Sequence, residues 1–186
     1  NVNFQDSENG WTPVNIAASK GHLEVLKVLI KAKANLDIPN NTGWTPVNNA
    51  ARNGHVEVLM ALIEAKADLN ISTDEGWTPA NIAADIGHLE VLKVLIEAGE
   101  KLDIPNNNGW TPVNTAAEKG HLDVVKVLIE AGANLDIPNN TGWTPVNNAA
   151  DKGHLDVVMA LIEAGADLNI SMNNGWTPVN IAARKG

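Results

Sequence analysis

Histidine recurs once in every 33 residues of this chain, each time directly after a glycine. Imidazole binds metal ions and transfers protons near neutral pH, so such a row suggests a metal site or a catalytic base. A metal site, however, needs several ligands within about 2.1 Å of the ion, and side chains one repeat apart cannot converge on one point. We therefore predict that these histidines form structural hydrogen bonds. They are His22, His55, His88, His121 and His154.

The composition argues against catalysis by a nucleophile. The chain has no cysteine, which excludes disulfides, thiolate metal sites and a cysteine nucleophile. No serine recurs in every repeat, and the single matching pair is Ser72 and Ser171, so a serine nucleophile has no support either. We therefore predict no enzymatic activity and no cofactor. The absence of cysteine also favours a reducing compartment, so we expect an intracellular, cytoplasmic protein.

Charge and hydropathy narrow the range of partners. The net charge is −9, and only 13 lysines and arginines are scattered along the chain. Nucleic-acid binding requires clustered basic residues, so we expect no nucleic-acid partner. No apolar run reaches the ~18 residues of a membrane span, so we expect no membrane insertion.

Tryptophan also recurs with the 33-residue period. Tryptophan is enriched among the residues that dominate binding energy at protein interfaces, so the row could contact a partner. Alternatively, each indole covers its own turn and wedges against the next repeat. Both interpretations stay open, because tryptophan suits both. The six residues are Trp11, Trp44, Trp77, Trp110, Trp143 and Trp176.

An asparagine stands two residues after the proline of every Thr-Pro pair. A row of amides could bind a polar ligand. A buried amide, however, needs hydrogen-bond partners, and the Thr-Pro turn offers them locally. We therefore favour a structural role, in which each side chain braces its own turn. The residues are Asn15, Asn48, Asn81, Asn114, Asn147 and Asn180.

One repeat, at residues 43–75, shows which elements would position these side chains. Its Thr-Pro pair predicts a helix start, with threonine as N-cap and proline in the first turn. This helix covers 46–53 and ends at Gly54. A second helix, over 55–67, carries apolar residues at helical spacing, and turn-forming residues follow it. Neither helix is long enough to be stable alone, so neighbouring repeats must stack.

Together these features resemble the ankyrin repeat. The matching residues of this repeat are Thr45-Pro46, Ala50-Ala51, Gly54-His55, the apolar run 58–63 and Ala67-Asp68. The resemblance implies an all-α repeat solenoid, an ankyrin stack of helix-turn-helix units joined by β-turn fingers. It also implies a non-enzymatic scaffold that binds other proteins through its fingers and concave face. We expect one array over residues 1–186, as part of a longer array. Its units lie at about 10–42, 43–75, 76–108, 109–141 and 142–174, with a partial unit at 175–186.

The family pattern singles out five further residues. Lys33 and Lys66 stand where the family has the glycine that ends the second helix, so each must adopt a positive φ at a cost of roughly 1 kcal/mol. Glu100 stands where the family has a small alanine. By resemblance alone, Asn70 and Asn169 match the site that asparaginyl hydroxylases modify. The family also has histidine where this chain has the asparagine after Thr-Pro.

A second period of 99 residues relates the two halves of the chain. The 36-residue stretches that begin at Asp37 and Asp136 are identical at 30 positions. We infer that a three-repeat block was duplicated in a natural protein. Between the copies, Arg52 becomes Asp151 and the next residue changes from asparagine to lysine. These positions end the first helix, where the family contacts partners, so the changes indicate an exposed surface that is free to vary.

We predict that a partner protein contacts the fingers and the varying positions of the first helices. Ile86 is the strongest single candidate, since it is apolar among charged residues. The alternatives are a spacer segment of a long repeat array, and a surface that binds a small ligand or a glycan. We expect a monomer, with end-to-end association as an alternative. The candidate contact residues are Trp44, Trp77, Trp110, Trp143, Asn49, Arg52, Asn53, Ile82, Asp85, Ile86, Thr115, Glu118, Lys119, Asn148, Asp151 and Lys152.

Overall fold

The computed structural model describes residues 1–173, 175–178 and 180. These residues form ten α-helices and no β-strand, which confirms the predicted all-α repeat fold. Not one of the helices described is both long enough and apolar enough for a membrane crossing. The chain divides into two compact units, Asn1–Lys101 and Leu102–Gly186.

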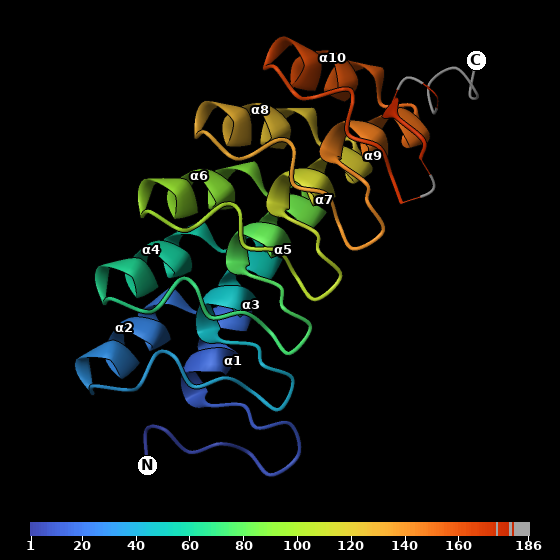
Figure 1. Ribbon diagram of the computed structural model, residues 1–186. Coiled ribbons are helices and arrows are strands. Elements are labelled where there is room, and N and C mark those ends of the chain that lie inside the picture. The colour runs from blue at the N-terminus through green and yellow to red at the C-terminus, as the bar shows by residue number, and fades with distance from the viewer. Residues whose placement is uncertain (174, 179, 181–186) are drawn as a thin grey trace. The chain divides into compact units, whose positions relative to one another are not determined.

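The first unit consists of three stacked helix pairs. The first helices α1, α3 and α5 contact one another in sequence, and the second helices α2, α4 and α6 form a row alongside them (Figure 1). The loops between pairs project from the side of the first helices. The helices are α1 (Pro13–Ser19), α2 (Leu23–Lys31), α3 (Pro46–Asn53), α4 (Val56–Glu64), α5 (Pro79–Ile86) and α6 (Leu89–Glu97).

The second unit repeats this arrangement with two described helix pairs. The first helices α7 and α9 contact each other, as do the second helices α8 and α10 (Figure 1). The helices are α7 (Pro112–Lys119), α8 (Leu122–Glu130), α9 (Pro145–Lys152) and α10 (Leu155–Glu163).

The Thr-Pro pairs start the first helices as predicted, and in α1, α3 and α7 an asparagine braces the helix start. Thr45 is the N-cap of α3, and its hydroxyl oxygen accepts a hydrogen bond from the backbone N–H of Asn48. The Asn48 Oδ1 in turn accepts from the backbone N–H and the hydroxyl of Thr45, at 2.9 and 2.6 Å. This reciprocal arrangement satisfies two donors of the helix start. The structural role predicted for the asparagines is confirmed for Asn15, Asn48 and Asn114. It is wrong for Asn147, whose side chain is fully buried but makes no hydrogen bond to any described residue.

The same amide also joins neighbouring repeats. The Asn15 Nδ2 donates to the carbonyl oxygen of Trp44 in the next finger at 3.1 Å, and Asn114 donates to Trp143 in the same way at 3.2 Å. Both asparagines are fully buried, so these bonds supply the partners that a buried amide requires. Each asparagine thus fixes its own turn and the finger that follows.

The core lies between the two rows of helices. Ala50 and Ala51 of α3 are completely buried, and their small side chains let the helices approach closely. Leu59 and Leu62 of α4 supply the large apolar side chains of the same layer. Lys66 follows α4 with a φ of 68°, which confirms the predicted left-handed conformation. Lys33 after α2 has a φ of 57° and confirms it a second time.

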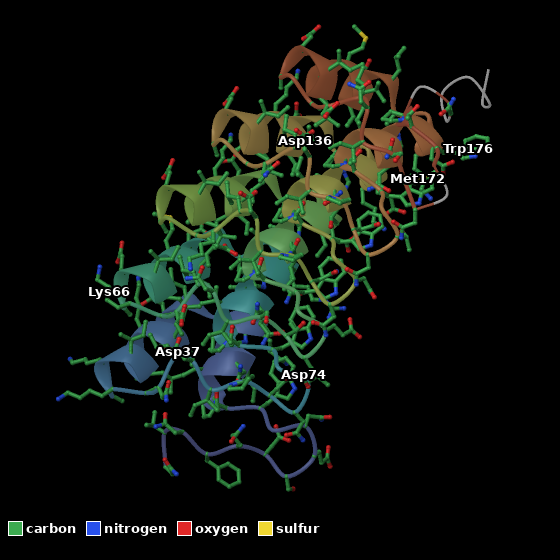
Figure 2. The ribbon with its side chains drawn as sticks, in the orientation of Figure 1. Asp37, Lys66, Asp74, Asp136, Met172 and Trp176 are labelled. Carbon is green, nitrogen blue, oxygen red and sulfur yellow. The ribbon has the colours of Figure 1, made fainter. Side chains whose placement is uncertain are left out.

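The fingers are closed turns that stack on one another. The Asn40 Oδ1 accepts from the backbone N–H of Trp44 at 2.9 Å, and the Asn40 N–H donates to the Trp44 carbonyl oxygen at 3.0 Å. The N–H of Asp74 donates to the carbonyl oxygen of Thr42 in the neighbouring finger at 3.2 Å. Gly43 lies at this approach with a φ of 78°, and a Cβ atom there would overlap the backbone of Asp74. Figure 2 shows Asp74 on the finger side of the unit.

Candidate functional site

The histidines join consecutive repeats. The ring Nε2 of His55 lies 3.1 Å from the carbonyl oxygen of Ser19, one repeat earlier. A carbonyl oxygen only accepts, so this ring nitrogen carries the proton. His88 and His154 make the same contact with the preceding repeat, at 3.1 and 3.0 Å. The structural role predicted for these three residues is confirmed. In the part of the chain that the structure describes, no three potential ligand side chains come together as a metal site would require.

The His55 ring also explains a glycine. A Cβ atom on Gly21 would lie 2.8 Å from the His55 ring, so the preceding repeat must have glycine there. Gly120 bears the same relation to His154 in the second unit. The Gly-His pair of the sequence therefore works between repeats, with the glycine of one repeat making room for the histidine of the next.

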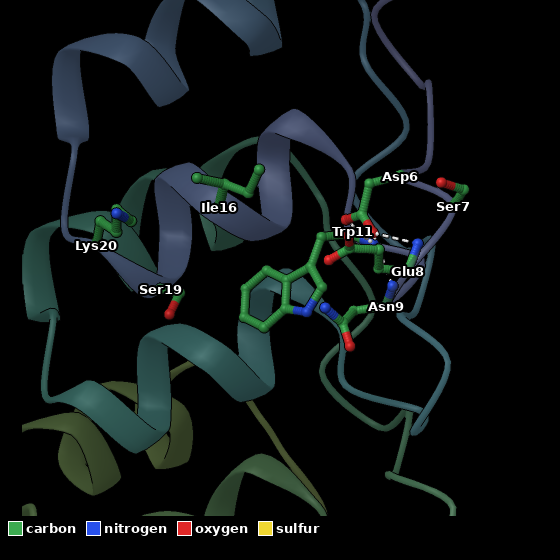
Figure 3. A pocket seen from close by; sticks show the side chains of 8 residues that line it. All are labelled: Asp6, Ser7, Glu8, Asn9, Trp11, Ile16, Ser19 and Lys20. Carbon is green, nitrogen blue, oxygen red and sulfur yellow. Dashed lines mark hydrogen bonds between the residues drawn. The ribbon is translucent and has the colours of Figure 1, made fainter.

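The described tryptophans are all half-buried. In the second unit, Trp143 and Trp176 pack against the buried side chains of Ala150 and Met172, and Figure 2 shows Met172 close to Trp176. In the first unit, the Trp11 ring lies between its finger and α1 (Figure 3). Each indole therefore covers its own repeat with one part of its surface and leaves another part accessible. Both interpretations of the tryptophan row remain compatible with these positions.

Three hollows lie between the fingers and the first helices of the first unit. The first contains Trp11 and Ile16 (Figure 3). The second lies between Trp11 and Trp44. The third lies between Trp44 and Trp77, and its volume is about 300 Å³. Consecutive hollows thus share a tryptophan as a wall.

Charged and apolar groups surround the second and third hollows. Arg52 lines both hollows, and its guanidinium lies 4.9 Å from the centroid of the Trp44 ring. Ile86, at the end of α5, lines the third hollow and is 41 % exposed. We use the name finger face for one surface of the first unit. This surface is lined by Trp11, Trp44, Trp77, Arg52 and Ile86.

The corresponding positions of the second unit carry different chemistry. Asp151 stands at the position of Arg52. An aspartate carries no positive charge, so Asp151 cannot make a cation–π contact with Trp143. The Lys152 ammonium instead lies 3.3 Å from the Glu118 carboxylate, one repeat earlier. Both of these side chains are partly exposed. Two copies of one block therefore present different faces over a shared core.

One of the predicted contact positions is buried, so the prediction is wrong there. We expected the variable position in the middle of the first helix to be exposed, but its residues are at most 4 % exposed. Two of the polar side chains fold back onto their own helix. Asn49 Nδ2 donates to the backbone carbonyl oxygen of Thr45 at 3.0 Å, and the Thr115 hydroxyl donates to the backbone carbonyl oxygen of Thr111 at 3.1 Å. The Nδ2 of Asn148 is buried without a partner among the residues described. Variation at this position therefore does not indicate an exposed contact surface. The four residues are Asn49, Ile82, Thr115 and Asn148.

Glu100 replaces the asparagine as the brace of α5. Its carboxylate Oε1 accepts from the backbone N–H of Ala80 at 2.9 Å. The Thr78 hydroxyl also bonds to this carboxylate, whereas the hydroxyls of Thr12, Thr45 and Thr111 bond to an asparagine. Glu100 is only 5 % exposed. Burial raises the pKa of Glu100 to about 8, although the bonds from Ala80 and Thr78 act in the opposite direction. In the sequence, this role was indicated only by an acidic residue, Glu100, at a position where the family has a small alanine.

The two candidate hydroxylation sites lie on exposed turns. Asn70 and Asn169 are both exposed, and the side-chain amide of Asn169 donates to the Asp167 carboxylate at 3.0 Å. Asn70 bonds weakly to Asp68 at 3.4 Å. Both side chains are accessible to an enzyme, and hydroxylation of either one stays a prediction.

Comparison with known proteins agrees with this geometry. A family model described as ankyrin repeats (3 copies) matches residues 1–73, 57–139 and 132–186. The chain therefore belongs to the ankyrin repeat family. The crystal structure of EF0377, an ankyrin repeat protein, superposes with a TM-score of 0.87 at 31 % sequence identity, over 94 % of this chain and 92 % of that one. No curated protein matches the sequence at a significant level. Ankyrin repeats are generally non-enzymatic modules for protein–protein interaction.

Proposed function

We propose that this chain is a non-enzymatic scaffold that binds another protein through its fingers and the ends of its first helices. The observation that carries the proposal is the finger face of the first unit. There, half-buried indoles border hollows, and the apolar side chain of Ile86 stands beside them at 41 % exposure. Tryptophan and arginine are the residue types most enriched among interface hot spots, and Arg52 lies directly on Trp44.

The proposed contact residues follow from accessibility. The four buried helix positions are not proposed for direct contact, because their side chains are at most 4 % exposed. The residues proposed for direct contact are Trp44, Trp77, Arg52, Asn53, Asp85 and Ile86 in the first unit, and Trp110, Trp143, Glu118, Lys119, Asp151 and Lys152 in the second.

Affinity capture with matched variants tests this proposal. The wild-type chain would be used as bait in an extract of the cells that produce it, beside Ile86→Asp and Trp77→Ala. Val28→Asp is the control, because Val28 is 68 % exposed on the second helix α2, away from the fingers. Circular dichroism and urea unfolding establish that each bait is folded.

The expected result is one set of proteins captured by the wild type and by Val28→Asp, and lost with Ile86→Asp and Trp77→Ala. A charge at position 86 must be desolvated in an apolar contact, which explains the loss. Equal capture by all four baits, or loss with Val28→Asp alone, would contradict the proposed surface.

A further inference from the structure

The finger face of the first unit alternates aromatic walls with hollows. Trp11 borders the first and second hollows, and Trp44 borders the second and third. The second and third hollows have volumes of about 360 and 300 Å³. These volumes lie at the lower end of the roughly 300–1,000 Å³ range of ligand pockets. Each hollow therefore suits a small part of a longer ligand that crosses several repeats.

The spacing of the walls favours one backbone conformation for such a ligand. Packed helices lie about 8–10 Å apart, so equivalent positions of successive repeats recur at about this distance. A polyproline II helix has three residues per turn and rises 3.1 Å per residue, which is about 9 Å per turn. Every third residue of such a segment would meet the next hollow. In a β-strand, residues on one face recur at only about 6.6 Å, which does not match.

The hydrogen-bonding groups of the face favour the same conformation. The described hydrogen bonds of Trp11, Trp44 and Trp77 involve only their backbone groups. An indole N–H is a donor only, so a ligand that contacts it must supply an acceptor. The carbonyl groups of a polyproline II segment have no internal bonds and can accept, whereas those of an α-helix are occupied. Proline-rich segments also dock in aromatic-lined grooves.

The charge of the face indicates the flanks of the ligand. The first hollow is lined by two carboxylates and one ammonium, and the third by two carboxylates and one guanidinium. The whole chain has a net charge of −9. Basic residues beside the proline segment would therefore be attracted to this surface. The acids are Asp6, Glu8, Glu75 and Asp85, and the bases are Lys20 and Arg52.

We propose that the finger face binds a proline-rich segment with basic flanks, held in the polyproline II conformation across successive tryptophans. This inference rests on the proposed function and names the partner's chemistry. Trp44 and Trp77 would contact successive turns of the segment. The Arg52 guanidinium, held over the Trp44 ring, would bond to a carbonyl group of the segment through its outer N–H donors.

Fluorescence anisotropy with labelled peptides and the full chain tests this inference. The probe is a segment of about nine prolines, or three polyproline II turns, between two pairs of lysines. One control peptide has glutamates in place of the lysines. A second control keeps the lysines but replaces the prolines with a flexible Gly-Ser segment, which tests conformation at constant charge.

Saturable binding of the basic proline peptide alone is the expected result. Trp44→Ala and Trp77→Ala should each weaken it by roughly tenfold or more, the loss that removal of a hot-spot aromatic causes. Val28→Ala is the matched control, because Val28 is an exposed apolar residue of α2, away from the fingers. Arg52→Asp, which introduces the residue of the second copy, should also weaken binding.

Absence of binding, equal binding of the Gly-Ser peptide, or equal affinity of Trp77→Ala and Val28→Ala would overturn the inference. The proposed function fails in a different way. If captured proteins still depend on Trp77 and Ile86 while the proline peptide does not bind, only the partner chemistry is wrong. If protein capture does not depend on these residues, the proposed surface itself is wrong.

Discussion

The guanidinium of Arg52 lies 4.9 Å from the centroid of the Trp44 ring, so a cation covers one face of this indole. The second copy of the block has Asp151 and Trp143 at these positions, and an aspartate cannot make this contact. The cores of the two copies nevertheless keep the same alanine pair and the same capping threonine. The duplicated blocks thus differ in the chemistry of the face and agree in the packing beneath it.

Arg52→Asp should lower the free energy of unfolding of the chain by about 0.5–1 kcal/mol, because an exposed cation–π contact is lost. Arg52→Lys should lose less, since it keeps the cation without the planar group. Urea unfolding followed by circular dichroism measures both. Indole emission should change with Arg52→Asp, as the Trp44 ring loses its covering group. Identical unfolding curves for all three proteins would show that the contact contributes nothing.

Glu100 should make stability depend on pH. Its pKa is raised to about 8 in the folded protein, whereas an unfolded glutamate titrates near 4.3. Between these values the folded state holds the additional proton, so the free energy of unfolding should fall as the pH rises, by up to about 1.4 kcal/mol per pH unit. The contribution is complete below the unfolded pKa and lost above about pH 8.

Glu100→Gln should remove this slope, because the amide keeps an acceptor for the Ala80 N–H and does not ionise. Glu97→Gln is the control, as Glu97 is exposed at the end of α6. Urea unfolding at pH 5, 6, 7 and 8 compares the slopes. Parallel pH profiles for wild type and Glu100→Gln would contradict the raised pKa.

Lys66→Gly should stabilise the first unit by about 1 kcal/mol, because the left-handed conformation at a φ of 68° strains a lysine and not a glycine. The second copy already has Gly165 at this place, with a φ of 88°. Lys31→Gly, inside the last turn of α2, should destabilise by up to about 1 kcal/mol. Thermal and urea unfolding distinguish the two signs. A loss of stability with Lys66→Gly would refute the assignment of strain.

His55→Ala should cost about 1–2 kcal/mol, because the Ser19 carbonyl oxygen loses its donor and the ring leaves its place against Gly21. His22 is the natural control: it occupies the same position one repeat earlier but is exposed. His22→Ala should therefore change stability by no more than about 0.5 kcal/mol. If both variants lose the same free energy of unfolding, the contact of His55 with the preceding repeat does not contribute to stability.

Much of the fold could be predicted because its rules are local. Thr45, Pro46 and Asn48 lie within four consecutive residues, and their capping bonds follow from short-range geometry. The left-handed lysines were identified from a single missing glycine in the pattern. The 33-residue period then implied stacking, since such short helices cannot stand alone.

The remainder depended on burial and on contacts that the repeat pattern does not contain. Glu100 reaches the start of α5 from 20 residues away, and no repeat pattern predicts this substitution for Asn81. Asn49 was expected at the surface because its position varies, yet its amide bonds to a carbonyl of its own helix and is buried. For the tryptophans, spacing alone did not separate packing from partner contact, and their half-buried rings are compatible with both.

Site-specific photo-crosslinking tests the central claim most directly. A photoreactive benzoylphenylalanine would replace Ile86 in one protein and Val28 in another, both exposed apolar positions of the first unit. After irradiation in the producing cells, we predict a discrete crosslinked protein from position 86 and none from position 28. Crosslinking from position 28 alone, or the same products from both positions, would contradict a partner-binding finger face.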